Sequence, residues 1–129
     1  MEIALRAALI TWIKADPALA AQLNAVAEEA PGRTALPWLA LAASASADWS
    51  AKDRLGREVR IALELHCRGD RPDSAAQLIA AIEARVASLP GVQTGFQVVT
   101  ATFLRARAEQ RGANTRAILI EYRFRLLSD

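Results

Sequence analysis

Residues 58–68 carry the clearest pattern in the chain, a strict alternation of apolar and polar side chains. A repeat of two places successive side chains on opposite sides of an extended chain, so this segment is predicted to be a β-strand with one buried face. The apolar positions are Val59, Ile61, Leu63, Leu65 and Cys67, and the polar ones are Arg60, Glu64, His66 and Arg68. A charged stretch that contains Trp49 precedes the strand, and we expect it to form a loop over residues 48–57.

The N-terminal segment predicts a long helix followed by a short one. Apolar side chains recur at helical spacing within residues 2–15, which is the pattern of an amphipathic helix. The stripe consists of Leu5, Ala8, Leu9, Trp12 and Ile13. Asp16-Pro17 then has the pattern of an N-cap followed by proline at the first helical position. The second helix is therefore expected to run to about Gln22, and Val26 marks a candidate short strand.

Proline and glycine bound the next two elements. Pro37 precedes an apolar, alanine-rich run at residues 38–45, which we expect to be a strand. The clearest helix begins at Pro72 and is ended by Pro90-Gly91. Its buried stripe is expected to consist of Ala75, Leu78, Ile79, Ile82, Val86 and Leu89.

The C-terminal part of the chain predicts two strands, at residues 95–108 and 115–127. Gly112 and Asn114 supply the turn between them. The second of these strands alternates cleanly, with Ile118, Ile120, Tyr122, Phe124 and Leu126 on one face. The first does not alternate, and its two half-apolar faces indicate a strand that is covered on both sides.

The order of the main elements is helix, strand, strand, helix, strand, strand. The connections at 48–57 and 109–114 are of hairpin length, which favours antiparallel pairing. The sequence therefore predicts an α+β fold in a single domain over residues 1–129. We expect a mainly antiparallel four-stranded sheet, with the N-terminal helix and one long helix packed on one face.

Composition and charge narrow the class of protein. The chain is 53% hydrophobic and 23% charged, which is typical of a globular domain. Its formal net charge is only +2, so composition does not indicate a dedicated nucleic-acid binder. The N-terminus lacks the pattern of a signal peptide, and no apolar run approaches the ~20 residues of a membrane span.

The residues that carry chemistry are sparse. Cys67 and His66 are each the only residue of their type, and as neighbours in a strand their side chains diverge. They cannot form a nucleophile–base couple, and a single cysteine excludes both a disulfide within the chain and a cysteine-based metal site. Asp48 and Asp53 are interpreted as solvated loop charges. We expect no cofactor, no metal and no catalysis.

Two features suggest contacts with other molecules. Trp49 lies in a charged loop, where a large aromatic side chain either folds back onto its own core or is kept for a partner. A basic set occupies the last hairpin and consists of Arg105, Arg107, Arg111, Arg116, Arg123 and Arg125. Aromatic residues are rare there, so a stacking platform for single-stranded nucleic acid is disfavoured. A solvated face, or one that faces other subunits, is the stronger interpretation.

Four stretches together resemble the tail-completion, or tail-terminator, proteins of long-tailed bacteriophages and gene transfer agents. They are "ALRAALITWIKADPALAAQL", "EEAPGRTALPWLALAASASADWSAKDRLGREVRIALELHCRG", "SAAQLIAAIEARVASLPGV" and "RGANTRAILIEYRFRLLSD". The first resembles the opening helix of that family, and the second its proline-led strand, Asp-Trp loop and alternating strand. The third resembles its long helix and the fourth its closing turn and strand. The likeness covers nearly the whole chain.

This resemblance implies a structural role without catalysis. Such proteins form a ring, typically of six subunits, which caps the finished tail tube, ends its polymerisation and presents the surface that joins the head. The implied partners are further copies of the chain, the tail tube protein and a head-side connector or stopper protein, with no membrane. DNA only passes through the channel. The implied location is a virion or gene-transfer-agent particle that is assembled in the bacterial cytoplasm.

The resemblance also suggests which residues make subunit or tail contacts. Loop 48–57 would be a contact element, and outward strand faces would line interfaces or the channel. The candidates are Asp48, Trp49, Lys52, Arg54, Arg57, Arg105, Arg107, Arg123 and Arg125. The alternative function is a small basic nucleic-acid-binding α+β module, whose binding would weaken steeply with salt.

Overall fold

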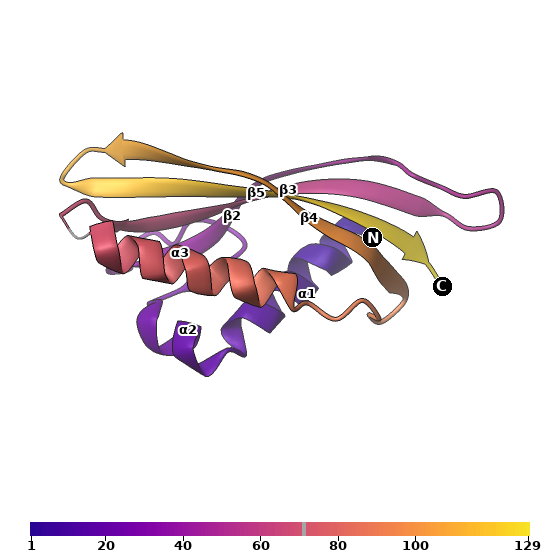
Figure 1. Cartoon of the computed structure of the whole chain (residues 1–129), viewed down its shortest axis with the longest axis horizontal. Coiled ribbons are helices and arrows are strands. Elements are labelled where there is room, and N and C mark those ends of the chain that lie inside the picture. Colours follow the sequence, from indigo (N-terminus) through magenta and orange to yellow (C-terminus); the bar gives the residue numbers. More distant parts are fainter. Residues whose placement is uncertain (71) are drawn as a thin grey trace.

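The helices of this protein lie on one face of a single β-sheet (Figure 1). The structure, a computed structural model, describes residues 1–70 and 72–129. Three helices and five strands form within these residues. The helices are α1 (Glu2–Lys14), α2 (Pro17–Gln22) and α3 (Pro72–Ala87), and the strands are β1 (Val26–Ala27), β2 (Trp38–Asp48), β3 (Gly56–Arg68), β4 (Phe96–Arg111) and β5 (Thr115–Ser128). The predicted α+β class is confirmed.

The candidate short strand at Val26 is confirmed as β1, so the sheet has five strands instead of the four expected. The sheet is mixed, although most of its pairs are antiparallel. Its order is β1-β2-β3-β5-β4, and β1 runs parallel to β2 with Val26 opposite Leu39. The other neighbours are antiparallel, as predicted. Two residues suffice for β1 because hydrogen bonds outside the strand extend the pairing. The Asn24 amide donates to the Pro37 carbonyl at 2.8 Å, and the Leu39 amide donates to the Ala25 carbonyl at 3.0 Å.

The core lies between the helices and the inner face of the sheet. Most of the predicted stripe residues on α1 and α3 are buried, and the others, Ala8, Trp12, Ile79 and Leu89, are partly buried. The inward positions of β3 and β5 are buried as their alternation indicated. The short helix α2 is also present, with Asp16 accepting from the Ala18 amide at 3.0 Å as its N-cap. Because Leu19 of α2 is fully buried, three helices cover the sheet instead of the two expected. The fully buried large side chains are Phe124, Leu5, Leu9, Ile13, Leu19, Leu39, Ile61, Leu63, Leu65, Ile82, Ile120 and Leu126.

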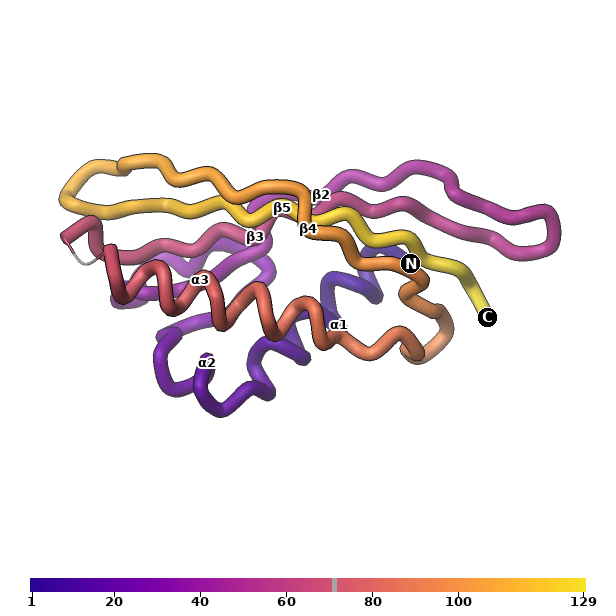
Figure 2. Tube along the Cα trace, viewed as in Figure 1, coloured from indigo at the N-terminus to yellow at the C-terminus, as the bar shows by residue number. Residues whose placement is uncertain are grey.

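The hairpin of β2 and β3 is longer than predicted, and it projects beyond the helix layer (Figure 2). Its strands continue to the pair Asp48 and Arg57, so the expected loop over 48–57 is reduced to residues 49–55. Gly56 permits this narrow end. A side chain there would collide with the backbone carbonyl of Trp49, and it would also meet that of Leu126.

Strand β4 forms one edge of the sheet, and most of it is exposed. Phe96 and Val98 are buried, but the rest of the strand is not, so in the single chain β4 is not covered on both sides. Irregularities between Val98 and Thr100 and between Phe103 and Arg105 shift its register against β5. Each extra residue moves the following side chains to the other face, which explains the absence of clean alternation.

The turn between β4 and β5 differs from the predicted one in detail. Ala113 and Asn114 adopt positive φ angles of 59° and 57°, whereas Gly112 was expected to supply this conformation together with Asn114. Asparagine tolerates the left-handed region well, and alanine does so rarely. The Asn114 carbonyl accepts a hydrogen bond from the Gly69 amide at 2.9 Å, which fixes the turn against the end of β3.

Candidate functional site

The end of the β2–β3 hairpin, residues 49–55, is ordered by its own hydrogen bonds, and we call it the hairpin tip. The Trp49 amide donates to the Gly56 carbonyl at 3.0 Å, and the Ala51 amide donates to the Arg54 carbonyl at 2.8 Å. Ser50 links both sides, because its hydroxyl donates to Asp48 Oδ1 at 2.6 Å and accepts from the Gly56 amide at 3.0 Å. The tip is therefore a preformed projection, which lowers the entropy cost of binding.

Arg54 fastens the hairpin tip to the end of β5. Its Nε and Nη2 atoms donate to the Ser128 carbonyl at 2.8 and 2.5 Å, and the Ser128 amide donates to the Leu55 carbonyl at 2.9 Å. This candidate contact residue therefore has a structural task within its own chain. Leu55 itself is 70% exposed, and Asp48 and Lys52 are exposed as well.

Trp49 lies outside the core, but it is only half-exposed. The Arg125 guanidinium is 5.6 Å from the centroid of the Trp49 ring, and Arg125 Nε donates to Glu58 Oε2 at 3.1 Å. The indole therefore packs beside a charged side chain at the surface, which leaves part of its apolar area available.

Arg57 is exposed and lies near the start of α1. Its charge adds to the causes that lower the pKa of Glu2, of which a hydrogen bond from the Ser44 hydroxyl is the largest. The two oxygen atoms of this hydrogen bond are 2.5 Å apart, and Arg6 Nη1 donates to the same hydroxyl at 2.6 Å. These contacts fix the N-terminus of α1 to β2.

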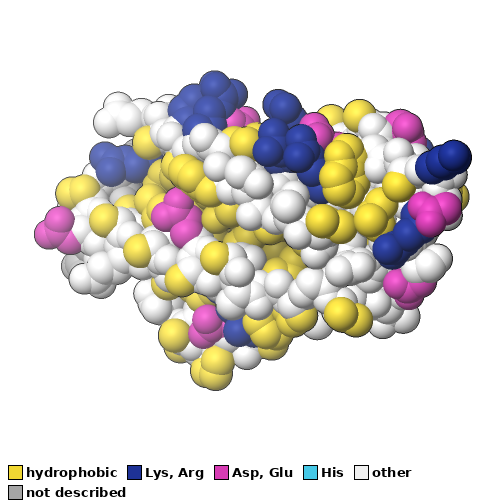
Figure 3. Space-filling model, turned by 45° about the vertical axis from the view of Figure 1, so that its right-hand side comes forward, with side chains coloured by type: hydrophobic (Ala, Val, Ile, Leu, Met, Phe, Trp, Pro, Cys, Tyr) yellow, Lys and Arg dark blue, Asp and Glu magenta, His cyan; other side chains and the backbone are white. Residues whose placement is uncertain are grey.

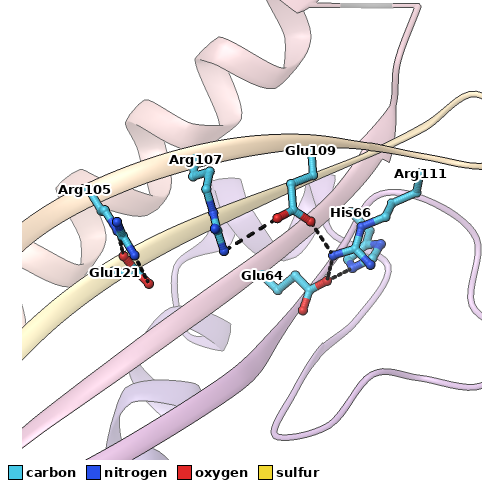
Figure 4. A network of polar contacts seen from close by, with 7 residues as sticks. All are labelled: Glu64, His66, Arg105, Arg107, Glu109, Arg111 and Glu121. Carbon is cyan, nitrogen blue, oxygen red and sulfur yellow. Dashed lines mark hydrogen bonds and ion pairs between the residues drawn. The ribbon is translucent and has the colours of Figure 1, made fainter.

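The face of the sheet that points away from the helices, which we call the outer face, is charged. Figure 3 shows Lys and Arg side chains gathered on the sheet side of the molecule. Figure 4 shows seven residues that lie close together there. Arg105 pairs with Glu121, Arg107 Nη2 lies 3.6 Å from Glu109 Oε1, and Arg111 Nη2 lies 3.1 Å from Glu109 Oε2.

This network continues across the sheet to β3 and β2. Arg111 Nη2 lies 3.4 Å from Glu64 Oε1, which in turn lies 2.6 Å from His66 Nε2. The His66 ring stacks on Trp38, with 3.9 Å between the centroids. The predicted contact residues Arg105 and Arg107 are thus neutralised by neighbouring carboxylates. The hydrogen bond from Arg105 also lowers the pKa of Glu121, which keeps that carboxylate charged.

Arg60 and Arg123 are the exception to this neutralisation. They face each other directly across β3 and β5 on the outer face, and neither takes part in an ion pair among residues 1–70 and 72–129. The Nε atom of Arg123 is buried and has no hydrogen-bond partner within that part of the chain. Like charges directly opposite each other destabilise a sheet. The sequence analysis included Arg123 and missed Arg60, because only the strand register shows that the two are opposite.

A recess of about 530 Å³ lies beside Arg60 on the sheet. Its lining combines small side chains of β2 and β3 with charged side chains of β3, β4 and β5, and it includes Ala43, Ala45, Arg60, Ala62, Leu104, Arg105 and Glu121. Arg60 forms no ion pair within residues 1–70 and 72–129, but its charge acts on Glu121 in the same lining and helps to lower the pKa of that carboxyl. Arg60 and Arg123 therefore form a positive point on the outer face that has no direct ion pair among the described residues.

The variant Arg60→Gln is expected to stabilise the isolated protein. Removal of one of two opposed charges relieves a repulsion of about 0.2–1 kcal/mol, which corresponds to an increase in Tm of about 1–4 °C at low salt. The gain should shrink in about 0.5 M salt, because added ions screen the repulsion. Differential scanning calorimetry at both salt concentrations measures this. The control Arg107→Gln removes a charge that pairs with Glu109, so its Tm should not rise; an equal rise would contradict the interpretation.

Metal-ligating side chains do not gather in the part of the chain that the structure describes. Within residues 1–70 and 72–129, no group of three His, Cys, Asp or Glu side chains is placed to hold a metal ion. Cys67 is buried in the core, which raises the pKa of its thiol, while His66 lies on the outer face. None of the helices in this part of the chain is long and apolar enough to cross a membrane.

Comparison with known proteins places this geometry in a family. The model of the family "Tail completion protein gp17" matches residues 7–127. The chain belongs to this tail completion family. The resemblance found in the sequence is thereby confirmed, and the family has a structural role in the phage tail. None of the curated proteins that were compared matches the chain.

A solved structure agrees with the family assignment. A chain of a structure described as the virion of a native gene transfer agent particle superposes with a TM-score of 0.80 and 25% sequence identity. The match covers 97% of this tail completion protein and 96% of the other chain, so the whole fold is shared. Both findings support the predicted location in a virion or gene transfer agent particle.

Proposed function

We propose that this tail completion protein assembles with further copies into a ring, typically of six subunits, that caps the finished tail tube. The structural observation that carries the proposal is the exposed edge of β4. This strand has 16 residues, and the exposed fractions of Val99, Phe103 and Leu104 are 42%, 47% and 38%. A long edge with apolar side chains is a surface that proteins normally cover.

The ring ends polymerisation of the tube and offers a surface to the head. The partners on its two sides are the tail tube protein and a head-side connector or stopper protein, and DNA passes through the channel. The role requires shape and contact surfaces, so the protein performs no catalysis. The hairpin tip and the β4 edge are different surfaces, and a contact between two different surfaces generates a closed ring when its rotation closes.

Sedimentation over a range of concentrations, with and without purified tail tube, tests this function. We expect a hexamer, or an association that strengthens with concentration or on addition of tube. Addition of the protein to growing tubes should also fix their length. A protein that stays monomeric at high concentration and in the presence of tube would exclude the ring.

The unneutralised pair of Arg60 and Arg123 favours one alternative, a small basic module that binds nucleic acid. Such binding would fall steeply with salt, because released counterions drive it. Fluorescence anisotropy with a labelled duplex, in about 50 and 200 mM salt, separates the two functions. A ring protein should show weak binding without sequence preference, whereas tight and strongly salt-dependent binding would favour the module.

A further inference from the structure

A groove runs between α3 and the exposed part of β4. It has a volume of about 410 Å³, and Figure 3 shows hydrophobic side chains in a hollow between the sheet and the helix layer. Its lining is mostly small or apolar and consists of Glu83, Ala84, Val86, Ala87, Ala101, Phe103 and Tyr122. Because the alanines leave space between helix and strand, the groove is wide enough to take a side chain of another molecule.

Two polar groups at this groove lack partners. The Tyr122 hydroxyl is buried without a hydrogen bond to any residue that the structure describes, and the Tyr122 side chain is only 4% exposed. Glu83 forms no ion pair within the same described residues. Both residues line the same groove, and burial, followed by the negative charge of Glu83, raises the pKa of Tyr122 to about 12. A buried polar group without a partner is costly, so it indicates a missing ligand group.

The residues that line the groove fit the side chain of a lysine or an arginine. The aliphatic stem of a lysine or arginine packs well against alanine and phenylalanine, while its cationic head seeks a carboxylate. In this groove the head would meet Glu83, and its approach would give the Tyr122 hydroxyl a neighbouring polar group. The half-exposed ring of Phe103 adds a cation–π surface at the entrance. An acidic or purely apolar occupant would leave Glu83 opposed or unpaired.

The chain itself carries such a side chain on a projecting element. Lys52 is exposed in the hairpin tip and forms no ion pair among the described residues. The tip extends beyond the helix layer (Figure 2), as an element must if it is to enter a groove recessed between a helix and a strand. Leu55, at 70% exposure, is an apolar neighbour that can cover the edge around Phe103.

We propose that Lys52 in the hairpin tip of one copy binds the groove of Glu83 and Tyr122 on the next copy. This inference rests on the proposed ring and names the two surfaces that meet in it. The contact is heterologous, because the tip and the groove are different parts of the chain. It explains why the tip is rigid, why Lys52 is unpaired, and why Ala84, Ala87 and Ala101 leave an open groove.

Charge reversal tests the contact. The single variants Lys52→Glu and Glu83→Lys should each weaken the association measured by sedimentation at least about 10-fold, since each places like charges together. The double variant restores an opposite-charge pair and should recover to within about 3-fold of the wild type. Lys52 is exposed and Glu83 is partly exposed, and unchanged thermal melts show that the variants fold. The control Lys14→Glu reverses the only other lysine, on α1, and should leave association unchanged.

A zero-length carbodiimide cross-link provides a direct readout. With only two lysines in the chain, a peptide that joins Lys52 to Glu83 between copies is easily identified by mass spectrometry. Tyr122→Phe removes a single oxygen atom and should weaken association several-fold without lowering Tm, because no internal hydrogen bond is lost.

The outcomes separate this contact from the ring itself. If the wild type assembles while both charge reversals assemble equally well and no Lys52–Glu83 peptide forms, the proposed contact is wrong and the ring stands. Double-variant association as weak as in the single variants would also overturn the contact. A wild-type protein that remains monomeric with and without tail tube overturns both the ring and the contact.

Discussion

The variant Phe124→Ala is expected to lower the free energy of unfolding by about 3–5 kcal/mol. Phe124 lies in β5, an interior strand that pairs with β3 on one side and β4 on the other, and is fully buried, with its ring centroid 6.0 Å from that of Tyr122. Truncation removes a large apolar side chain and leaves a cavity between the sheet and three helices that are held from several sides. Urea denaturation followed by circular dichroism measures the loss as a shift of the midpoint at constant slope.

Phe103→Ala is the matched control for this experiment. The same truncation at a side chain that is 47% exposed should lower the free energy of unfolding by less than about 1 kcal/mol. If both variants lost the same free energy of unfolding, the difference in burial between Phe124 and Phe103 would not determine their contribution to stability. A small loss at Phe124 alone would mean that the core collapses readily around the missing ring.

The variant Trp49→Ala is expected to act on assembly instead of folding. Trp49 is outside the core and contacts Arg125 at the surface, so its removal should reduce the free energy of unfolding well below the 3–5 kcal/mol typical of a core aromatic. As a preformed aromatic anchor in the hairpin tip, it should contribute about 2 kcal/mol or more to ring formation or tail binding. Thermal melts and sedimentation of the same samples separate the two effects.

Trp12→Ala supplies the opposite case. Trp12 Nε1 donates to the Arg85 carbonyl at 2.8 Å, and the Arg85 guanidinium lies 3.6 Å from the Trp12 ring centroid, so this side chain joins α1 to α3. Its loss should destabilise the single chain more than the loss of Trp49.

Asp48→Ala should change association little, because an exposed charge at an interface rim contributes little. If Trp49→Ala unfolds the protein while Trp12→Ala is tolerated, Trp49 belongs to the core and the account of this loop is wrong.

Patterns with one buried face were readable from the sequence. The alternation in β3 and β5 and the stripes on α1 and α3 each repeat a single period, and burial follows them. The failures lie where a partner elsewhere in the chain decides the outcome. Val26 was marked as a candidate short strand, but its place in the sheet depends on backbone groups of Pro37 and Leu39, which no local pattern reveals. The two irregularities of β4 hide its alternation, so this edge strand was predicted to have both of its faces covered.

The candidate contact residues divide in the same way. Position along the chain was enough to mark Trp49 and Lys52 as residues of a charged loop, and the structure places both in the hairpin tip. It was not enough to show that Arg54 is held by the Ser128 carbonyl or that Arg105 pairs with Glu121. Arg60 and Glu83 became candidates only through the strand register and through the packing of α3 beside β4. The role of a charged side chain depends on which residues surround it in the fold, and the sequence alone does not show those neighbours.

The insertion of β5 between β3 and β4 has a consequence for how the protein is made. A ribosome releases the chain from its N-terminus, so β3 and β4 leave the exit tunnel before the strand that separates them. Until residues 115–128 follow, one edge of β3 and the pairing edge of β4 lack the strand that joins them, and the sheet cannot close. The domain must therefore fold after nearly all of it has been synthesised. A premature stop before β5 would yield an aggregation-prone fragment with two open edges, and no partly active subunit.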